Sequence, residues 1–201
     1  MAEARWLEAR GVDAVIAQGA EAGGHRGMFL SDDIAGQPGL FALLPQVVDA
    51  VRLPVIAAGG ISDGRGVAAA FALGASAVQV GTAYLRAPQA ATAPLHRAEL
   101  GEARDDATRL TNLFTGRPAR SLLNRFMREY GPMSEKAPAF PLAAGALAPL
   151  RAYWEKRGSP DYSPLWAGQA AALAREEDAG ALTERLWREA KERLAALKLE
   201  P

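Results

Sequence analysis

The chain alternates short, almost continuously apolar runs with stretches of helical composition. Three of the runs are predicted to be strands: Val12 to Gly19, Leu53 to Gly60 and Ser76 to Leu85. Strands that are apolar throughout, rather than every second residue, are typical of a parallel sheet that is covered on both faces. The first part of the chain is therefore predicted to be α/β.

The segments before and between these runs carry helix signals. Residues 3–10 favour a helix that ends at Gly11, and Pro45 is suited to the first turn of a second helix. Ser62 is the expected N-cap of a third helix, which stops at Gly74. Strand and helix therefore alternate three times.

Beyond Arg86 the pattern changes, because Pro, Arg and Ala dominate and strand signals disappear. We therefore expect residues 1–90 to hold the strand–helix units and residues 91–201 to form a helical C-terminal region.

The last helix is predicted over Ala181 to Leu197. Apolar residues recur there at helical spacing, which favours a helix docked on the rest of the chain, with a coiled partner helix as the alternative. The expected apolar face consists of Leu182, Leu186, Ala190, Leu194 and Leu197, and the expected i,i+4 ion pairs are Glu184–Arg188 and Glu189–Arg193.

Composition narrows the possible functions. Lys and Arg total 23, as do Asp and Glu, so the net charge of zero gives no reason to expect nucleic acid or an anionic membrane as partner. The absence of cysteine excludes disulfides, thiolate metal sites and a cysteine nucleophile, and two histidines make a multi-histidine metal site improbable. The first residues are charged and no apolar run is long enough to span a bilayer, so we expect a cytoplasmic protein without a metal.

The first candidate site is the run from Gln18 to Gly27, QGAEAGGHRG, directly after a predicted strand. Loops at the carboxyl ends of parallel strands form the functional face of such folds. Paired glycines let a ligand approach the backbone, and His25 can exchange a proton near neutral pH. A glycine turn with a solvent-facing histidine is the simpler alternative, but the setting favours function.

Two further glycine motifs follow the next two strands: AAGGIS, residues 57–62, and QVGT, residues 79–82. Backbone N–H groups of such loops, aided by a helix N-terminus, bind phosphate. Two successive strand-end glycine turns about twenty residues apart match the phosphate site of the last two strands of a (β/α)8 barrel. Glycines that only allow close helix–strand packing are the alternative.

Other candidates are weaker. Arg26 could orient an anionic substrate or be a solvated loop charge, and Glu21 could act as acid or base or make only local hydrogen bonds. Trp166 to Gln169 could fold back on the barrel mouth, although aromatic packing explains Trp166 equally well. His96 is assigned no role.

Taken together, these segments resemble the nitronate monooxygenases, also called 2-nitropropane dioxygenases. The resemblance rests on VDAVIAQGAEAGGHRG, LPQVVDAVRLPVIAAGGISDGRGVAAAFALGASAVQVGTAYL, FTGRPARSLLNRF and WAGQAAALARE. It implies the C-terminal part of an FMN-binding (β/α)8 (TIM) barrel followed by a helical region. It also implies a catalytic role for His25 and FMN contacts from Gln18, Gly23, Gly59, Gly60, Gln79, Val80, Gly81 and Thr82.

The implied reaction is the oxidation of alkyl nitronates by O2 to a carbonyl compound and nitrite. FMN-dependent enoyl-ACP reductases, which use NAD(P)H, share most of these motifs but commonly have an acidic residue at the place of Gln18. IMP dehydrogenases resemble the phosphate loops but need a cysteine, which this chain lacks.

Three strands cannot close a barrel, which needs eight. Open strand edges are prone to association. We therefore expect a fragment, a half completed by a chain that carries the N-terminal half-barrel, or a chain that pairs with its own copy. A non-catalytic partial barrel that acts as a partner subunit is the other possibility.

Overall fold

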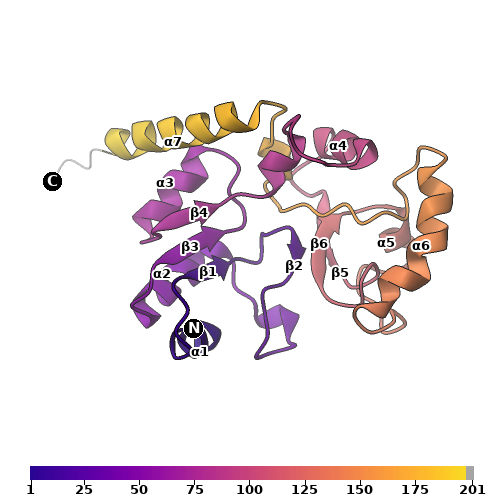
Figure 1. The fold of residues 1–201 in the computed structure, drawn as a ribbon, viewed down its shortest axis with the longest axis horizontal. Coiled ribbons are helices and arrows are strands. Elements are labelled where there is room, and N and C mark those ends of the chain that lie inside the picture. Colours follow the sequence, from indigo (N-terminus) through magenta and orange to yellow (C-terminus); the bar gives the residue numbers. More distant parts are fainter. Residues whose placement is uncertain (198–201) are drawn as a thin grey trace.

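The computed structural model describes residues 1–197 and contains a parallel sheet of three strands (Figure 1). These are β1 (Val15–Gln18), β3 (Val55–Ala58) and β4 (Ala77–Gln79), in the spatial order β1-β3-β4. The parallel register aligns Gln18 with Ala58 and Ala58 with Gln79, so the three strands end at the same level. The α/β prediction is confirmed, and the glycine motifs that follow the strands come together at one edge.

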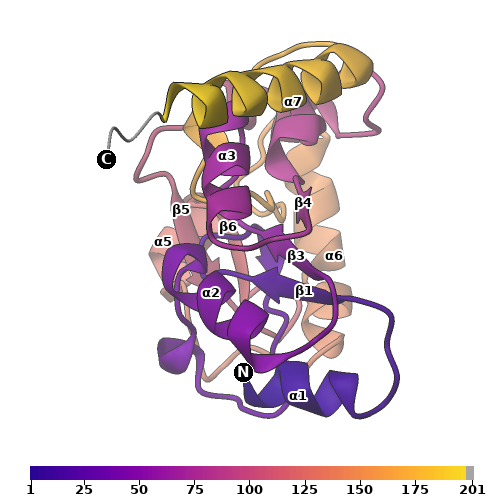
Figure 2. The ribbon, with the colours of Figure 1, turned by 90° about the vertical axis from the view of Figure 1, so that its left-hand side faces the viewer.

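Three helices pack around this sheet: α1 (Ala2–Glu8), α2 (Leu40–Ala50) and α3 (Gly64–Ala72) (Figure 2). Gly11 and Gly74 follow the first and third helices with positive φ, as predicted for glycines at helix ends. The predicted third strand was too long, because it ends at Gln79 and a 3-10 turn, Thr82–Arg86, follows.

Two predicted helix starts were wrong. Helix α2 begins at Leu40 and contains Pro45, because the Glu21 carboxylate accepts the Leu40 N–H at 2.8 Å and so anchors the first turn. Helix α3 is capped by Asp63 instead of Ser62, since the Asp63 side chain accepts from the Arg65 and Gly66 N–H groups.

A second sheet was not predicted. It is antiparallel, in the order β2-β6-β5, and consists of β2 (Gly24–His25), β5 (Thr108–Thr111) and β6 (Ala119–Leu122). Two of its strands lie where we expected only helices. Strand β6 is buried along its whole length although it contains Arg120 and Ser121. Arg120 donates to the Ala20 carbonyl at 3.0 Å, so a contact from a distant segment satisfies its guanidinium. A charged residue at this position is why the apolar pattern did not predict the strand.

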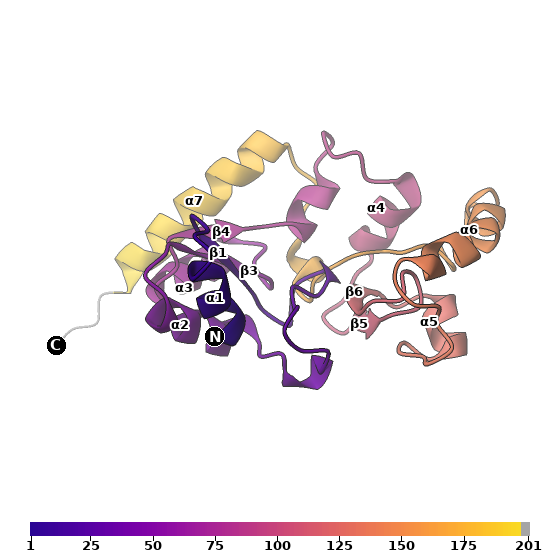
Figure 3. The ribbon, with the colours of Figure 1, turned by 60° about the horizontal axis from the view of Figure 1, so that its bottom comes forward.

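The other helices of the second part are α4 (Pro94–Gly101), α5 (Arg125–Tyr130) and α6 (Leu142–Glu155), with short 3-10 turns at Ile34–Gly36 and Ala171–Leu173 elsewhere. Figures 1 and 3 show the two sheets side by side, and in Figure 1 β2 is the strand of the second sheet nearest the first. Since β2 belongs to residues 1–90 while β5 and β6 belong to residues 91–201, the two ranges share one sheet.

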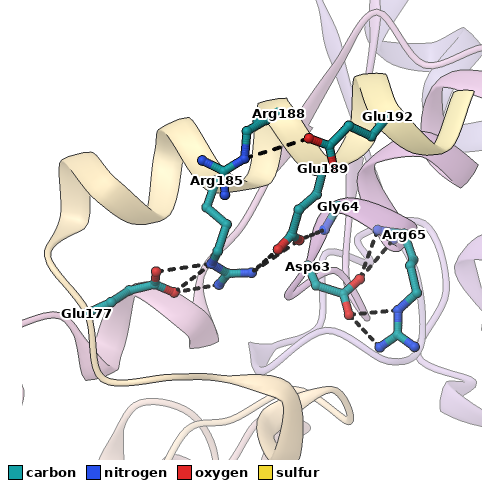
Figure 4. Close-up of polar contacts among 9 residues, drawn as sticks. Asp63, Gly64, Arg65, Glu177, Arg185, Arg188, Glu189 and Glu192 are labelled. Carbon is teal, nitrogen blue, oxygen red and sulfur yellow. Dashed lines mark hydrogen bonds and ion pairs between the residues drawn. The ribbon is translucent and has the colours of Figure 1, made fainter. Parts of the chain in front are cut away.

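The long helix α7 (Ala179–Ala196) packs against α3 and crosses it (Figure 2). Leu182, Leu186 and Ala190 are buried as expected, but Leu194 and Leu197 are exposed. The i,i+4 ion pairs found in this helix are Arg185–Glu189 and Arg188–Glu192 instead of the two that we expected (Figure 4). The helix is therefore docked on its own chain.

Within residues 1–197, no helix is both long enough and apolar enough to cross a membrane.

Candidate active site at the strand ends

A cavity of about 210 Å³, here called the strand-end cavity, opens at the carboxyl ends of β1, β3 and β4. Seven of the eight residues predicted to contact a cofactor line it: Gln18, Gly23, Gly59, Gly60, Gln79, Gly81 and Thr82. The eighth, Val80, packs against the hydrophobic core instead. The geometry therefore brings the three glycine motifs to one place.

The β3 loop depends on glycine for its shape. Gly59 and Gly60 have φ values of 109° and 69°, a region that L side chains rarely adopt. A Cβ on Gly59 would lie 3.0 Å from the Ala22 backbone nitrogen, and one on Gly60 would lie 3.3 Å from the Glu21 Cβ. The loops after β1 and β3 therefore touch through glycine backbone and form one wall of the cavity.

The loops after β3 and β4 carry hydrogen-bond donors that have no partner in residues 1–197. The backbone N–H groups of Gly60, Ile61 and Gly81 donate to no acceptor in that range. The Ser62 hydroxyl is buried there without a partner as well. Because buried polar groups are nearly always paired in folded proteins, the unpaired Ser62 hydroxyl beside this cavity indicates a ligand with acceptor atoms. The exposed Gly60 and Gly81 line the same cavity, and their N–H groups are available to such a ligand.

The first turn of α3 does not contribute to this donor set, contrary to the prediction. Asp63 accepts the N–H groups of Arg65 and Gly66, and Glu189 on α7 accepts that of Gly64 at 3.1 Å (Figure 4). Burial alone would raise the pKa of Glu189, but hydrogen bonds from Gly64 and Arg185 outweigh it and hold that pKa below its ordinary value. An anion in the cavity must therefore bind the loop N–H groups.

The loop of Trp166 to Gln169 closes the cavity from the C-terminal part. The Gly168 N–H donates to the Thr82 hydroxyl at 2.9 Å, and the Gln169 N–H donates to the Glu21 carbonyl at 2.9 Å. Both interpretations of Trp166 hold, because its ring lines the cavity and also packs edge-on against Phe114 at 5.6 Å.

His96, to which the sequence assigned no role, supports this loop. Its Nε2 lies 3.1 Å from the Trp166 carbonyl, which can only accept, so the ring donates there. Burial lowers the pKa of His96 against the opposing effect of this hydrogen bond. The two residues are 70 positions apart, and local sequence patterns do not predict contacts over such a separation.

His25 lies beside the strand-end cavity, on β2, and does not itself line it. Its neighbour Gly24 does, and the His25 ring lies 5.5 Å from the ring of Trp166. Burial lowers the pKa of His25, and the positive charge of Arg117 lowers it further. The imidazole is therefore neutral near pH 7 and able to accept a proton.

Arg26 is buried against the loop after β1 instead of being a solvated charge. It is 3% exposed and donates to the carbonyls of Ala22 and Gly19 at 2.5 and 2.6 Å and to the Gln37 side chain at 2.8 Å. Burial, aided by Arg120 and opposed by Glu21, lowers the pKa of Arg26 to about 10, so it stays charged at neutral pH. Its role is to hold the loop after β1.

Two other polar residues of this loop also have structural partners. Glu21 caps α2 through Leu40, so the local hydrogen-bonding interpretation describes its contacts. Gln18 donates to the His25 carbonyl at 3.2 Å and accepts from the Gly27 N–H at 2.8 Å. The Gln18 side chain therefore links the end of β1 to the histidine segment while it lines the cavity.

Comparison with known proteins gives a consistent result. A family model described as nitronate monooxygenase matches residues 1–189. A nitronate monooxygenase from Paraburkholderia phytofirmans is 46% identical over 198 residues, which cover 98% of this chain and 54% of that protein. One from Pseudomonas aeruginosa is 44% identical over 188 residues, which cover 93% of this chain and 54% of that protein. The chain thus spans about half the length of these curated relatives.

Solved structures agree. Nitroalkane oxidase from Streptomyces ansochromogenes matches 98% of this chain and 57% of its own, with a TM-score of 0.90 at 48% identity. FabK from Thermotoga maritima matches 98% of this chain and 60% of its own, with a TM-score of 0.78 at 35% identity. The fold is that of the C-terminal part of a (β/α)8 barrel with a largely helical region after it.

Proposed function

Because this chain belongs to the nitronate monooxygenase family, we propose that it supplies the cofactor-phosphate loops and the proton-accepting histidine of an FMN-dependent enzyme. The proposed reaction is the oxidation of alkyl nitronates by O2 to a carbonyl compound and nitrite. The observation that carries the proposal is the cluster of unpaired donors at the strand ends, Gly60, Ile61, Gly81 and the Ser62 hydroxyl. We assign this role to residues 1–90.

The donor set fits the phosphate of FMN. The four residues that carry these donors line one small cavity, and a phosphate offers several acceptor oxygens. Gly81 adds room, because a Cβ there would meet nothing within 4 Å. The cavity of about 210 Å³ is smaller than the ~300–1,000 Å³ of complete ligand pockets, so these loops enclose only part of such a cofactor. When bound, FMN supplies the redox chemistry.

His25 is proposed to act on the substrate. As a neutral imidazole it can take the proton from the carbon beside the nitro group of a nitroalkane, or hold the nitronate anion once it is protonated. Trp166 and Phe140, whose rings lie 5.5 and 5.9 Å from the His25 ring, offer apolar walls for the alkyl part. The chain thus provides binding, orientation and a proton acceptor.

The β1 edge of the parallel sheet is unpaired in the described residues. Strand β1 pairs only with β3 in the described residues, and Ile16 on it is 50% exposed. A cavity of about 520 Å³ runs along this edge and is lined partly by Phe29 and Leu30, which are also exposed. We propose that further barrel strands pair here, from a polypeptide with the N-terminal half-barrel or from a second copy.

A second candidate function is enoyl-ACP reduction with FMN and NAD(P)H. The structural match to FabK favours it, but that match is weaker than the one to nitroalkane oxidase. Gln18 also fits the first candidate better, because the reductases commonly carry an acidic residue there. A non-catalytic partial barrel is the third possibility.

One experiment separates these candidates. The chain, assembled with the N-terminal half-barrel, is loaded with FMN and mixed without oxygen either with an alkyl nitronate or with NADH. Loss of flavin absorbance with the nitronate alone supports the proposal, whereas loss with NADH alone supports the reductase. An assembly that retains no flavin would leave only the non-catalytic role. His25→Gln is the matched variant, expected to keep the flavin but lose turnover of the neutral nitroalkane.

A further inference from the structure

The ring of His25 is held by a residue 90 positions later in the chain. Its Nε2 lies 2.9 Å from the Oγ1 of Thr115. Thr115 belongs to the turn between β5 and β6, and the same hydroxyl has two further contacts, both with Arg117. It donates to the Arg117 carbonyl at 3.2 Å and accepts from the Arg117 N–H at 3.4 Å. The histidine is therefore one part of a small hydrogen-bond network.

Counting hydrogen atoms decides which ring nitrogen carries the proton. A hydroxyl has one proton to donate and two lone pairs that can accept. If Nε2 carries the imidazole proton, it donates to Thr115 Oγ1, which then accepts twice and donates once to the Arg117 carbonyl. All three contacts are satisfied together in this arrangement.

The opposite tautomer satisfies fewer groups. Thr115 would have to donate to Nε2, and the Arg117 carbonyl would lose that donor. The ring proton would then lie on Nδ1, which makes no hydrogen bond within residues 1–197, where only Nε2 is bonded. Because an unpaired donor is costly at a half-buried position, the network favours the proton on Nε2 and leaves Nδ1 with a free lone pair.

The turn that holds Thr115 is itself constrained. Gly116 has a φ of 87°, and a Cβ there would collide with the backbone of Pro138 to Phe140, the segment whose Phe140 ring packs on His25. The Arg117 guanidinium donates to the Met28 carbonyl at 2.6 Å, just after the histidine segment. The turn therefore contacts the histidine segment at several points, and Thr115 has little freedom to move away.

We propose that Thr115 is a positioning residue that fixes His25 with its proton on Nε2, so that Nδ1 is the proton-accepting atom. The use of Nδ1 rests on the function proposed above, whereas the tautomer is a property of this chain alone. In that use, the carbon–hydrogen bond of the nitroalkane breaks and its proton binds Nδ1. The electron pair forms the C=N bond of the nitronate, and no oxidant is needed in this step.

The test is a long-range 1H–15N correlation spectrum of the uniformly 15N-labelled full chain, recorded well above the pKa of both histidines. With only His25 and His96 present, His25→Gln assigns the signals. His96, whose Nε2 must donate to a carbonyl, serves as the internal standard for the Nε2–H form. We expect the same pattern for His25 in the unaltered chain, a mixture of both tautomers in Thr115→Val, and return of the pattern in Thr115→Ser.

Two results would overturn the proposal: a proton on Nδ1 in the unaltered chain, or an unchanged His25 pattern in Thr115→Val. A second measurement uses the assembled enzyme. Thr115→Val should lower kcat/KM for a neutral nitroalkane about tenfold and lower the rate with preformed nitronate less, because only the neutral nitroalkane needs His25 as a proton acceptor. If the spectra behave as expected but both rates are unchanged, the tautomer assignment stands and the function proposed for His25 fails.

Discussion

Glu189 and Gly64 meet where two helices cross, with the Glu189 carboxylate accepting the Gly64 N–H at 3.1 Å. The two residues are 125 positions apart, yet they join the middle of α7 to the first turn of α3 (Figure 4). A Cβ on Gly64 would lie 2.7 Å from the Ala190 nitrogen, so the helices approach this closely only because residue 64 is glycine. This contact places α7 directly behind the candidate phosphate loop.

Gly64→Ala is expected to destabilise the fold by about 1–3 kcal/mol, because the added methyl group meets rigid backbone of α7 and must push the helices apart. Urea unfolding followed by circular dichroism measures the loss. Gly66→Ala, on the same helix, is the matched control. A Cβ there would make an ordinary 3.4 Å contact with Ile61, so this change should stabilise by up to about 1 kcal/mol. Equal effects of the two changes would contradict the close-contact explanation.

Glu189→Gln tests the pH dependence of this contact. The folded-state pKa of Glu189 lies below its ordinary value of 4.5, so its contribution to stability is complete above pH 4.5 and disappears as the pH falls through the folded-state pKa. The variant should therefore lose less stability than the unaltered chain over that acidic range, as measured by urea unfolding at a series of pH values. Glu192→Gln, in an exposed pair with Arg188 at 3.9 Å, serves as control and should keep the original pH dependence.

Gly81→Ala should weaken FMN binding at least tenfold while changing stability little. The φ of Gly81 is −110°, which alanine can adopt, and its Cβ would point into open space. That space is where we propose the phosphate binds, so the methyl group would displace the ligand instead of straining the fold. Flavin fluorescence titration measures the Kd, with Gly145→Ala as the control because its Cβ also meets nothing within 4 Å. Unchanged affinity in Gly81→Ala would remove this loop from the proposed site.

Arg117→Met should raise the pKa of His25 toward its ordinary value of 6.5, because the charge of Arg117 is the second cause of its lowering after burial. The change would show in an NMR pH titration of the two histidines. His96 provides the control within the same sample, since burial lowers its pKa against a hydrogen bond to Trp166, without Arg117.

The stability consequence follows from the direction of the shift. A histidine with a lowered folded-state pKa stabilises the fold above its unfolded pKa, and this contribution is lost as the pH falls through the folded-state value. Arg117→Met should therefore reduce the loss of stability on acidification below about pH 6.5. Equal movement of both histidines in the titration would show that the substitution disturbs the fold as a whole.

Local patterns along the chain predicted the parallel sheet and the place of the candidate site. Val15–Gln18, Val55–Ala58 and Ala77–Gln79 are apolar enough to be recognised as buried strands, and each is followed by its own glycine turn. Such signals depend on near neighbours, so a single sequence shows them. The same patterns indicated that Gln18, Gly60 and Gly81 would meet, because parallel strands that start together also end together.

The tertiary structure decided the features whose hydrogen-bond partners lie far away in the sequence. Strand β6 contains a buried arginine and a buried serine. Ala20 and Thr108 accept the hydrogen bonds of Arg120, and the Ser121 hydroxyl accepts the Leu165 N–H. The start of α2 depends on a carboxylate 19 residues upstream, and the Gly64 N–H in the first turn of α3 donates to Glu189, 125 residues downstream. The orientation of His25 likewise depends on Thr115. These contacts satisfy polar groups across the fold, and no local periodicity records them, because the partners are adjacent only in space.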